Sequence, residues 1–74
     1  MRILIVGAGA VGGYFGGRLL EAGQNVTFLV RPERAIKLTQ RGLIIKQPDN
    51  TLLTFTSPPI VLAEEIKQPY DLFY

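Results

Sequence analysis

The sequence predicts an α/β domain in which a parallel sheet carries an added β-hairpin. Residues 3–6 and 26–30 are short runs rich in β-branched and aliphatic residues, and the first run is apolar at every position. Such a run suits a central parallel strand that is covered on both faces. Residues 11–22, which lie between the two runs, have apolar residues at helical spacing. The three segments therefore form a strand-helix-strand unit.

The helix predicted at residues 11–22 is unusual in its glycine content. The face that we expect to be buried consists of apolar residues at helical spacing, Val11, Phe15, Leu19 and Ala22. Gly23 is expected to cap its C-terminus. Four positions inside the helix are also glycine, at residues 12, 13, 16 and 17, and each costs about 0.8–1.0 kcal/mol relative to alanine. We therefore expect these glycines to serve a purpose other than helix stability.

The remaining elements follow from turn and helix signals. Pro32 suits the first position of a second helix, which we expect to run to about residue 40 and to end at Arg41 and Gly42. Residues 43–46 and 51–56 flank a turn-forming group and predict a β-hairpin. Prolines at 58 and 59 favour an extended passage, and residues 62–68 are expected to form one or two helical turns. A further buried strand opens at Asp71, and we expect the domain, residues 1–74, to be truncated in this fourth strand.

Composition excludes several function classes. The net charge of +2 is spread along the chain without a basic run, which argues against a nucleic-acid partner. The chain has no Cys and no His, so disulfides, thiol nucleophiles and the commonest metal ligands are absent. Residues 3–17 superficially resemble a signal peptide, but the six glycines among them make a poor apolar segment. We expect a cytoplasmic protein with no membrane segment and no metal site.

A glycine-rich turn directly follows the first strand and opens the first helix. It has the spacing G-x-G-x-x-G, formed by Gly7, Ala8, Gly9, Ala10, Val11 and Gly12. In this context Gly7 permits the tight turn, Gly9 lets the backbone approach a pyrophosphate, and Gly12 allows close packing of helix and strand. These six residues are the candidate cofactor-binding residues, and the domain is predicted to be a Rossmann-type dinucleotide-binding domain. A turn of this kind that binds nothing is the alternative.

Arg31, at the end of the second predicted strand, indicates which dinucleotide binds. NAD-binding domains usually place an acid there to accept hydrogen bonds from the ribose, and no acid lies between Glu21 and Glu33. A guanidinium can instead bind the 2′-phosphate of NADP. Arg31 is therefore a candidate cofactor-binding residue, against the alternative of an ordinary solvated arginine, and Arg34 is a weaker second candidate. Regulatory nucleotide-sensing modules and FAD-binding domains, the other function classes open here, usually have an acid at this position.

The other charged and aromatic residues are not expected to form a site. Glu64 and Glu65 are adjacent and project in different directions, so we interpret them as solvated, together with Lys46 and Lys67. Two aromatic residues of the first helix, at positions 14 and 15, are interpreted as core residues in preference to contacts with a nicotinamide ribose.

Residues 7–19, Gly-Ala-Gly-Ala-Val-Gly-Gly-Tyr-Phe-Gly-Gly-Arg-Leu, with Arg31 after the second strand and Asp71-Leu72 opening the fourth, closely resemble the N-terminus of the ketopantoate reductase family. The resemblance implies part of an NADPH-dependent 2-dehydropantoate 2-reductase, which reduces ketopantoate to pantoate on the route to pantothenate and coenzyme A. It implies that residues 7–12 hold the pyrophosphate and Arg31 the 2′-phosphate. It also implies a small 2-keto acid as substrate and catalytic residues in a helical domain absent from this chain. Other members reduce other 2-keto acids, and neither substrate nor oligomeric state follows from these residues.

Overall fold

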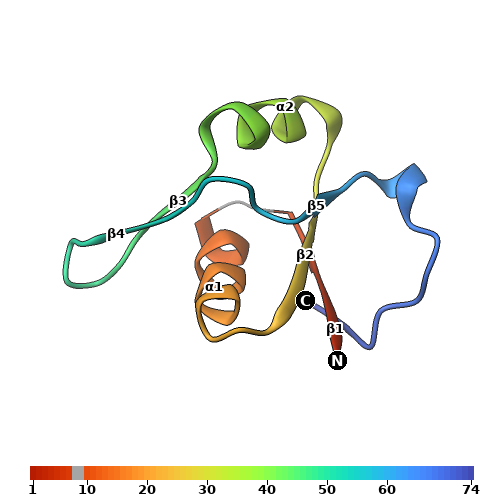
Figure 1. Cartoon of the computed structure of the whole chain (residues 1–74), viewed down its shortest axis with the longest axis horizontal. Helices are drawn as coiled ribbons and strands as arrows, with labels where there is room; N and C mark the ends of the chain where they lie inside the picture. The colour runs from red at the N-terminus through yellow and green to blue at the C-terminus, as the bar shows by residue number, and fades with distance from the viewer. Residues whose placement is uncertain (8–9) are drawn as a thin grey trace.

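The computed structural model describes residues 1–7 and 10–74, and for residues 10 and 11 it describes the backbone alone. One sheet contains β1 (Arg2–Val6), β2 (Asn25–Leu29), β5 (Ile60–Val61) and β6 (Leu72–Phe73), and a separate two-stranded sheet contains β3 (Leu43–Lys46) and β4 (Leu52–Phe55). The helices are α1 (Ala10–Glu21), α2 (Pro32–Arg41) and the 3-10 helix η1 (Ala63–Glu65) (Figure 1). The predicted α/β fold with a parallel sheet and an added hairpin is confirmed.

The larger sheet is parallel, and its strand order is β5-β2-β1-β6. The chain moves outward from β1 to β2 and then β5, and it returns to the other side of β1 to form β6. When only the strands of this sheet are numbered along the chain, their order in space is 3-2-1-4, which is that of the first four strands of a Rossmann domain. The direction in which the chain adds strands reverses beside β1. Ligands of such sheets bind outside the carboxyl ends of the strands at the point of reversal. The topology therefore directs attention to the turn that follows β1.

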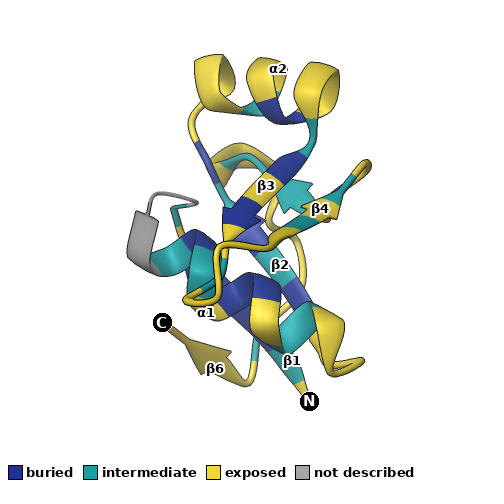
Figure 2. Ribbon diagram, turned by 90° about the vertical axis from the view of Figure 1, so that its left-hand side faces the viewer, coloured by how far each residue is buried: buried dark blue, intermediate teal, exposed yellow. Residues whose placement is uncertain are grey.

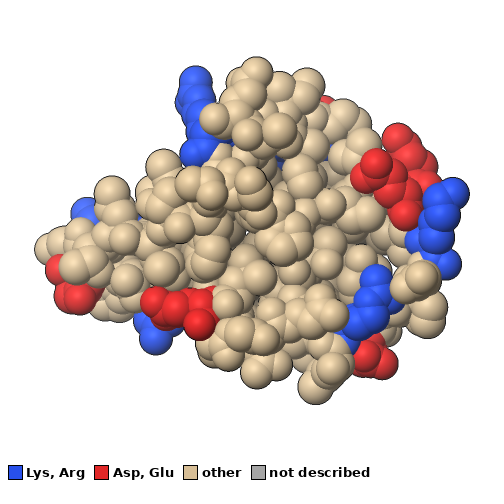
Figure 3. Space-filling view, in the orientation of Figure 1, with Lys and Arg blue, Asp and Glu red and all other residues tan. Residues whose placement is uncertain are grey.

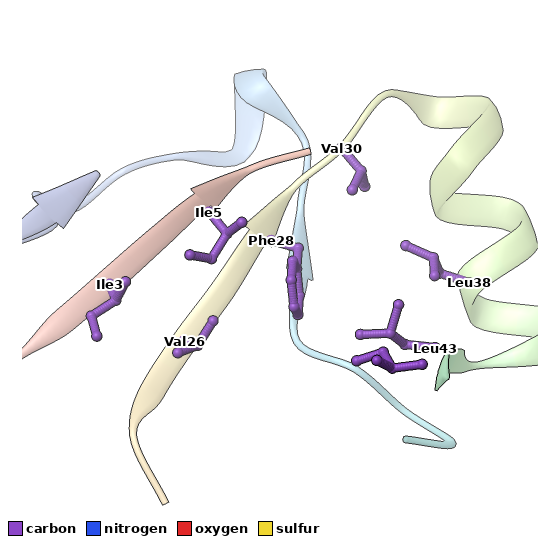
Figure 4. Packing of buried hydrophobic residues seen from close by; sticks show 8 residues of the cluster. Ile3, Ile5, Val26, Phe28, Val30, Leu38 and Leu43 are labelled. Atoms are coloured by element: carbon purple, nitrogen blue, oxygen red, sulfur yellow. The ribbon is translucent and has the colours of Figure 1, made fainter. Parts of the chain in front are cut away.

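The core lies between this sheet, the two helices and the hairpin (Figures 2 and 4). Ile3, Leu4 and Ile5 are consecutive and all buried, which confirms the prediction that β1 is covered on both faces. On the helix side, Phe28 of β2 has no exposed surface and shares a cluster with Leu38 of α2 (Figure 4). This cluster has eight members, Ile3, Ile5, Val26, Phe28, Val30, Leu38, Leu43 and Ile45, whereas Leu4 is buried outside it. The hairpin contributes the last two members of the cluster and is thus part of the core.

The predicted buried face of α1 is largely wrong. Phe15 is 39% exposed, Ala22 lies exposed beyond the end of the helix, and Leu19 is half-buried. The side chain of Val11 lies outside the described part of the chain. The most buried positions of α1 are instead three glycines, at residues 13, 16 and 17. The helix lies so close to its neighbours that its buried side has little room for side chains, and apolar spacing alone could not indicate this.

The strand expected to open at Asp71 is present as β6, but it is not buried, because Leu72 and Phe73 are 46% and 64% exposed. Two other segments after the hairpin have details that the sequence did not indicate. The extended passage after Ser57 contains the short strand β5, where the amide of Phe28 donates to the Pro59 carbonyl at 2.9 Å. The helical turns expected at residues 62–68 are confined to η1, where a Glu65 carboxylate oxygen accepts from the amide of Leu62 at 2.8 Å. The expected cap at Gly23 is present, because its amide donates to the Leu20 carbonyl at 2.9 Å.

Candidate functional site

A pocket of about 570 Å³ lies at the carboxyl edge of the parallel sheet. Because β1, β2 and β5 are parallel, the segments that follow them meet at this edge. Residues from all three segments line the pocket: Val6, Gly7, Leu29, Val30, Arg31, Pro32, Glu33, Arg34, Leu62, Ala63 and Glu64. Its volume falls within the range typical of small-molecule sites. Its walls are mostly apolar, and the charged side chains come from the starts of α2 and η1.

Gly7 forms the wall of this pocket next to β1. Its φ is +90°, a conformation that residues with a Cβ rarely adopt. Its amide donates to the carbonyl of Leu29 at 2.7 Å, which ties the turn to the end of β2. A Cβ added here would have no neighbour within 4 Å. The backbone conformation, and not crowding, therefore requires glycine at this position.

Gly12, in the first turns of α1, lies against the same turn. A Cβ on Gly12 would be 3.2 Å from the carbonyl oxygen of Gly7 and 3.4 Å from Cγ2 of Ile5. The distance to the Gly7 carbonyl oxygen is shorter than most Cβ contacts, so the turn or the helix would have to shift by a few tenths of an ångström, whereas the distance to Ile5 is an ordinary contact. The close packing of helix and strand expected at this position is therefore present.

The remaining residues of the predicted phosphate turn are described in part or not at all. Ala8 and Gly9 lie outside the described residues, and Ala10 and Val11 open α1 with their backbones only. Helix α1 therefore starts within a few residues of Gly7, on the side of the sheet where a phosphate would meet the positive end of the helix.

Arg31 lies two residues after the end of β2 and precedes Pro32, the first residue of α2. Its backbone is extended, with φ −79° and ψ 158°, and its side chain is exposed. The residue lines the same pocket as Gly7, although 24 positions separate them in the chain, and Arg34 lines it as well. The structure thus brings the glycine turn and both candidate arginines to one place.

The third wall of the pocket was not expected from the sequence. It is formed by Leu62, Ala63 and Glu64, which follow β5. Glu64 is exposed, as expected, and it also lies at the pocket, which was not expected. Acidic side chains gather over η1 in Figure 3. Recognising β5 would have placed this segment at the carboxyl edge, yet two residues of strand after two prolines give almost no sequence signal.

The two aromatic residues of α1 behave differently from each other. Tyr14 is half-buried and packs against the core, as expected. Phe15 is partly exposed and stacks on Tyr74, with ring centroids 4.4 Å apart and an interplanar angle of 32°. This contact joins α1 to the residue after β6, so Phe15 connects two elements beside the strand-order reversal.

Two further properties concern the described ranges as a whole. Within them, no three residues of types His, Cys, Asp or Glu are arranged to hold a metal ion. Neither α1 nor α2 is long and apolar enough to cross a membrane, and the same holds for η1.

Residues 3–73 match the family model described as ketopantoate reductase PanE/ApbA. The chain belongs to this family. Proteins of this family are oxidoreductases.

Similar proteins bear the same or a related name. A 2-dehydropantoate 2-reductase of Nostoc sp. (strain PCC 7120) is 39% identical over 59 residues, which cover 80% of this chain and 17% of that protein. The oxidoreductase YkpB of Bacillus subtilis (strain 168), whose printed name calls it uncharacterized, is 62% identical over 45 residues, or 61% of this chain and 15% of that protein.

A solved structure supports the fold assignment. The crystal structure of a protein assigned as a ketopantoate reductase, from Ralstonia solanacearum MolK2, superposes with a TM-score of 0.66 at 40% identity. It covers 81% of this chain, which spans 18% of that protein. The ketopantoate reductase domain described here thus spans less than a fifth of the length of these relatives.

Proposed function

We propose that this chain is the NADP-binding N-terminal part of an NADPH-dependent 2-dehydropantoate 2-reductase. The observation that carries the proposal is the meeting of Gly7 and Arg31 in one pocket at the carboxyl edge of the sheet. In the proposed protein, a separate helical domain supplies the catalytic residues and holds the 2-keto acid. The setting would be the cytoplasm, on the route to pantothenate and coenzyme A.

The described residues fit an adenine dinucleotide. The positive φ of Gly7 turns the chain sharply out of β1, and Gly12 allows α1 to start close to that turn. A pyrophosphate would then lie against the free N–H groups at the start of α1, where the helix dipole also favours negative charge. The mostly apolar pocket beside β2 and β5 is suited to the adenosine half. Bound NADPH would supply the hydride, and the residues of this chain would bind and orient it.

The preference for NADP rests on the charge at the end of β2. An acid at this position would accept hydrogen bonds from the ribose hydroxyls of NAD and would repel a 2′-phosphate. This chain has Arg31 there, and Arg34 lines the same pocket. The acids of the pocket, Glu33 and Glu64, come from α2 and η1, not from the strand end. A guanidinium at the strand end supports binding of the phosphorylated ribose.

The test is to replace Arg31 with alanine in the full protein and to measure binding of two adenosine fragments. The ligand 2′,5′-ADP carries the 2′-phosphate and 5′-AMP does not, so the ratio of their dissociation constants isolates this group. A charge-assisted hydrogen bond contributes about 1.5–3 kcal/mol, so Arg31→Ala should weaken binding of 2′,5′-ADP by about tenfold to a hundredfold. Binding of 5′-AMP should change little.

Arg41→Ala is the matched control, because it removes an arginine from the other end of α2, outside the pocket. It should leave both dissociation constants unchanged. Equal affinity of the wild-type protein for the two fragments would contradict the NADP preference. For the reaction itself, consumption of NADPH should be fastest with ketopantoate in a panel of 2-keto acids. A higher kcat/KM with another keto acid would assign the chain to a related reductase instead.

A further inference from the structure

Gly17 on α1 is in contact with the hairpin, and this contact leaves no room for a side chain. A Cβ on Gly17 would overlap Cδ1 of Ile45, and it would lie 3.4 Å from Cε2 of Phe55. Ile45 belongs to β3 and Phe55 to β4, so both strands of the hairpin approach the helix at this point. Figure 2 shows the hairpin lying alongside α1.

The helix is thus held from two sides. At the preceding residue of the same helix, a Cβ on Gly16 would lie 2.5 Å from Cε1 of Phe28, which belongs to the sheet. The contact at Gly16 determines how closely α1 lies to the sheet, and the contact at Gly17 determines how closely it lies to the hairpin. A polar contact links the same elements at the surface, where Arg18 donates from Nη1 to Oε1 of Gln47 at 3.3 Å.

The hairpin itself has little freedom to move away. Leu43 and Ile45 are 3% and 5% exposed, and both belong to the central cluster. At the base of the hairpin, a Cβ on Gly42 would lie 2.5 Å from the carbonyl oxygen of Phe55, so the end of α2 lies directly against β4. The overlapped Cδ1 atom is the flexible end of the Ile45 side chain, but Ile45 is buried and has little empty space into which that end could turn. We therefore expect a side chain at residue 17 to be accommodated in part by a shift of α1.

We propose that the β3–β4 hairpin positions the phosphate-binding start of α1, and that Gly17 is the positioning residue through which it acts. This inference rests on the proposed function, because it concerns where the pyrophosphate of NADP lies. Gly17 is seven residues from Ala10, the first residue of the helix, which corresponds to about 10 Å of a rigid helix. A displacement at Gly17 is therefore carried to the N–H groups at the helix start. Hydrogen bonds to charged groups need donor-acceptor distances of about 2.7–2.9 Å, so a shift of about 1 Å is enough to weaken them.

The test uses Gly17→Ala in the full-length reductase and measures binding of NADP⁺, 2′,5′-ADP and 5′-AMP. We expect NADP⁺ to bind at least tenfold more weakly, because its pyrophosphate contacts the displaced helix. The ratio between 2′,5′-ADP and 5′-AMP should stay that of the wild-type protein, because Arg31 lies on another element. A variant that had only lost stability would bind all three ligands as before under conditions in which it is folded.

Ile45→Val provides the compensating change, because it removes the Cδ1 atom that the new Cβ would overlap. The double variant Gly17→Ala/Ile45→Val should recover NADP⁺ affinity to within about threefold of wild type. Ile45→Ala, which cannot clash with the helix, removes support on the same side and should weaken NADP⁺ binding measurably, by about threefold. It keeps the proposal testable if Gly17→Ala does not fold. Leu38→Ala is the control, since it opens the same core from α2 and changes no residue of α1 or the hairpin. It should bind NADP⁺ as wild type does.

The possible failures are distinct from one another. If the wild-type protein does not bind NADP⁺, the proposed function fails and the inference fails with it. If the wild-type protein binds and folded Gly17→Ala binds equally well, the proposed function stands and the positioning role is refuted. The positioning role would also be refuted if Ile45→Val did not restore the NADP⁺ affinity lost in Gly17→Ala, or if Leu38→Ala lost as much affinity.

Discussion

Replacing Gly16 with alanine sets two physical effects against each other. Gly16 lies in the middle of α1, where alanine is the better helix former by about 0.8–1.0 kcal/mol. The added Cβ would however lie 2.5 Å from Cε1 and 2.7 Å from Cζ of Phe28, and 3.2 Å from Cγ1 of Ile5. Helix propensity alone predicts a more stable protein, whereas packing predicts a less stable one.

The packing effect should be the larger of the two. An ordinary contact needs about 3.4–4 Å between carbon atoms, so the ring or the helix must shift by almost 1 Å. Phe28 has no exposed surface and cannot swing into solvent. Overfilling a close-packed core costs about 1–3 kcal/mol. With the propensity gain subtracted, we expect Gly16→Ala to lower the free energy of unfolding by up to about 2 kcal/mol, or the melting temperature by up to about 16 °C.

The assay is hydrogen exchange of the Phe28 amide, which is bonded to the Pro59 carbonyl in the sheet and reports unfolding of the domain. Phe28→Leu and the double variant Gly16→Ala/Phe28→Leu complete a double-mutant cycle. Leucine lacks the two ring atoms, so alanine at residue 16 should cost much less in that background. Slower exchange in Gly16→Ala than in wild type, or strictly additive effects in the cycle, would refute the packing argument.

Two further predictions concern turns. Gly23 has φ +83°, and an added Cβ would have no atom within 4 Å. Gly23→Ala should therefore lower the free energy of unfolding by about 1–2 kcal/mol through backbone conformation alone, and Gly23→Asn should lower it clearly less. A urea unfolding series in which the alanine and asparagine variants are equally stable would contradict this. In the hairpin turn, hydrogen bonds from the Thr51 hydroxyl and amide hold the pKa of Asp49 below its usual 3.8. The stability that these hydrogen bonds give the folded turn is therefore present above that pH, and it is lost as the pH falls through the lowered pKa. The Thr51 amide shift should titrate at acidic pH in wild type and stay constant in Asp49→Asn.

The sequence predicted most of the fold because the signals for it are local. The apolar run before Gly7 and the Pro32 helix start each contain their own evidence, and the hairpin follows from its turn residues. The parallel pairing of β1 with β2 also follows from the strand-helix-strand pattern. Strand β5 escaped prediction because two residues carry no periodicity, and its pairing with β2 is decided by tertiary contact.

The site was predictable only in part, for the same reason. Gly7 and Arg31 were found because each directly follows a strand that the sequence reveals. Glu64 was missed because it follows the strand that the sequence hides. The buried face of α1 was misassigned because glycine carries no hydrophobic signal, and its burial depends on how closely the neighbouring elements approach.

The glycines of α1 show how this domain balances stability against position. The isolated helix gives up several kcal/mol of propensity, at about 0.8–1.0 kcal/mol for each glycine, so its helical structure must come from tertiary packing. The contacts at Gly12, Gly16 and Gly17 lie against three different elements, namely the turn after β1, β2 and the hairpin. A helix defined by three contacts has its starting point fixed in space, which the proposed phosphate-binding role of α1 requires. It follows that substitutions which strengthen α1 as a peptide should weaken the domain, and that the binding turn and the core fold as one unit.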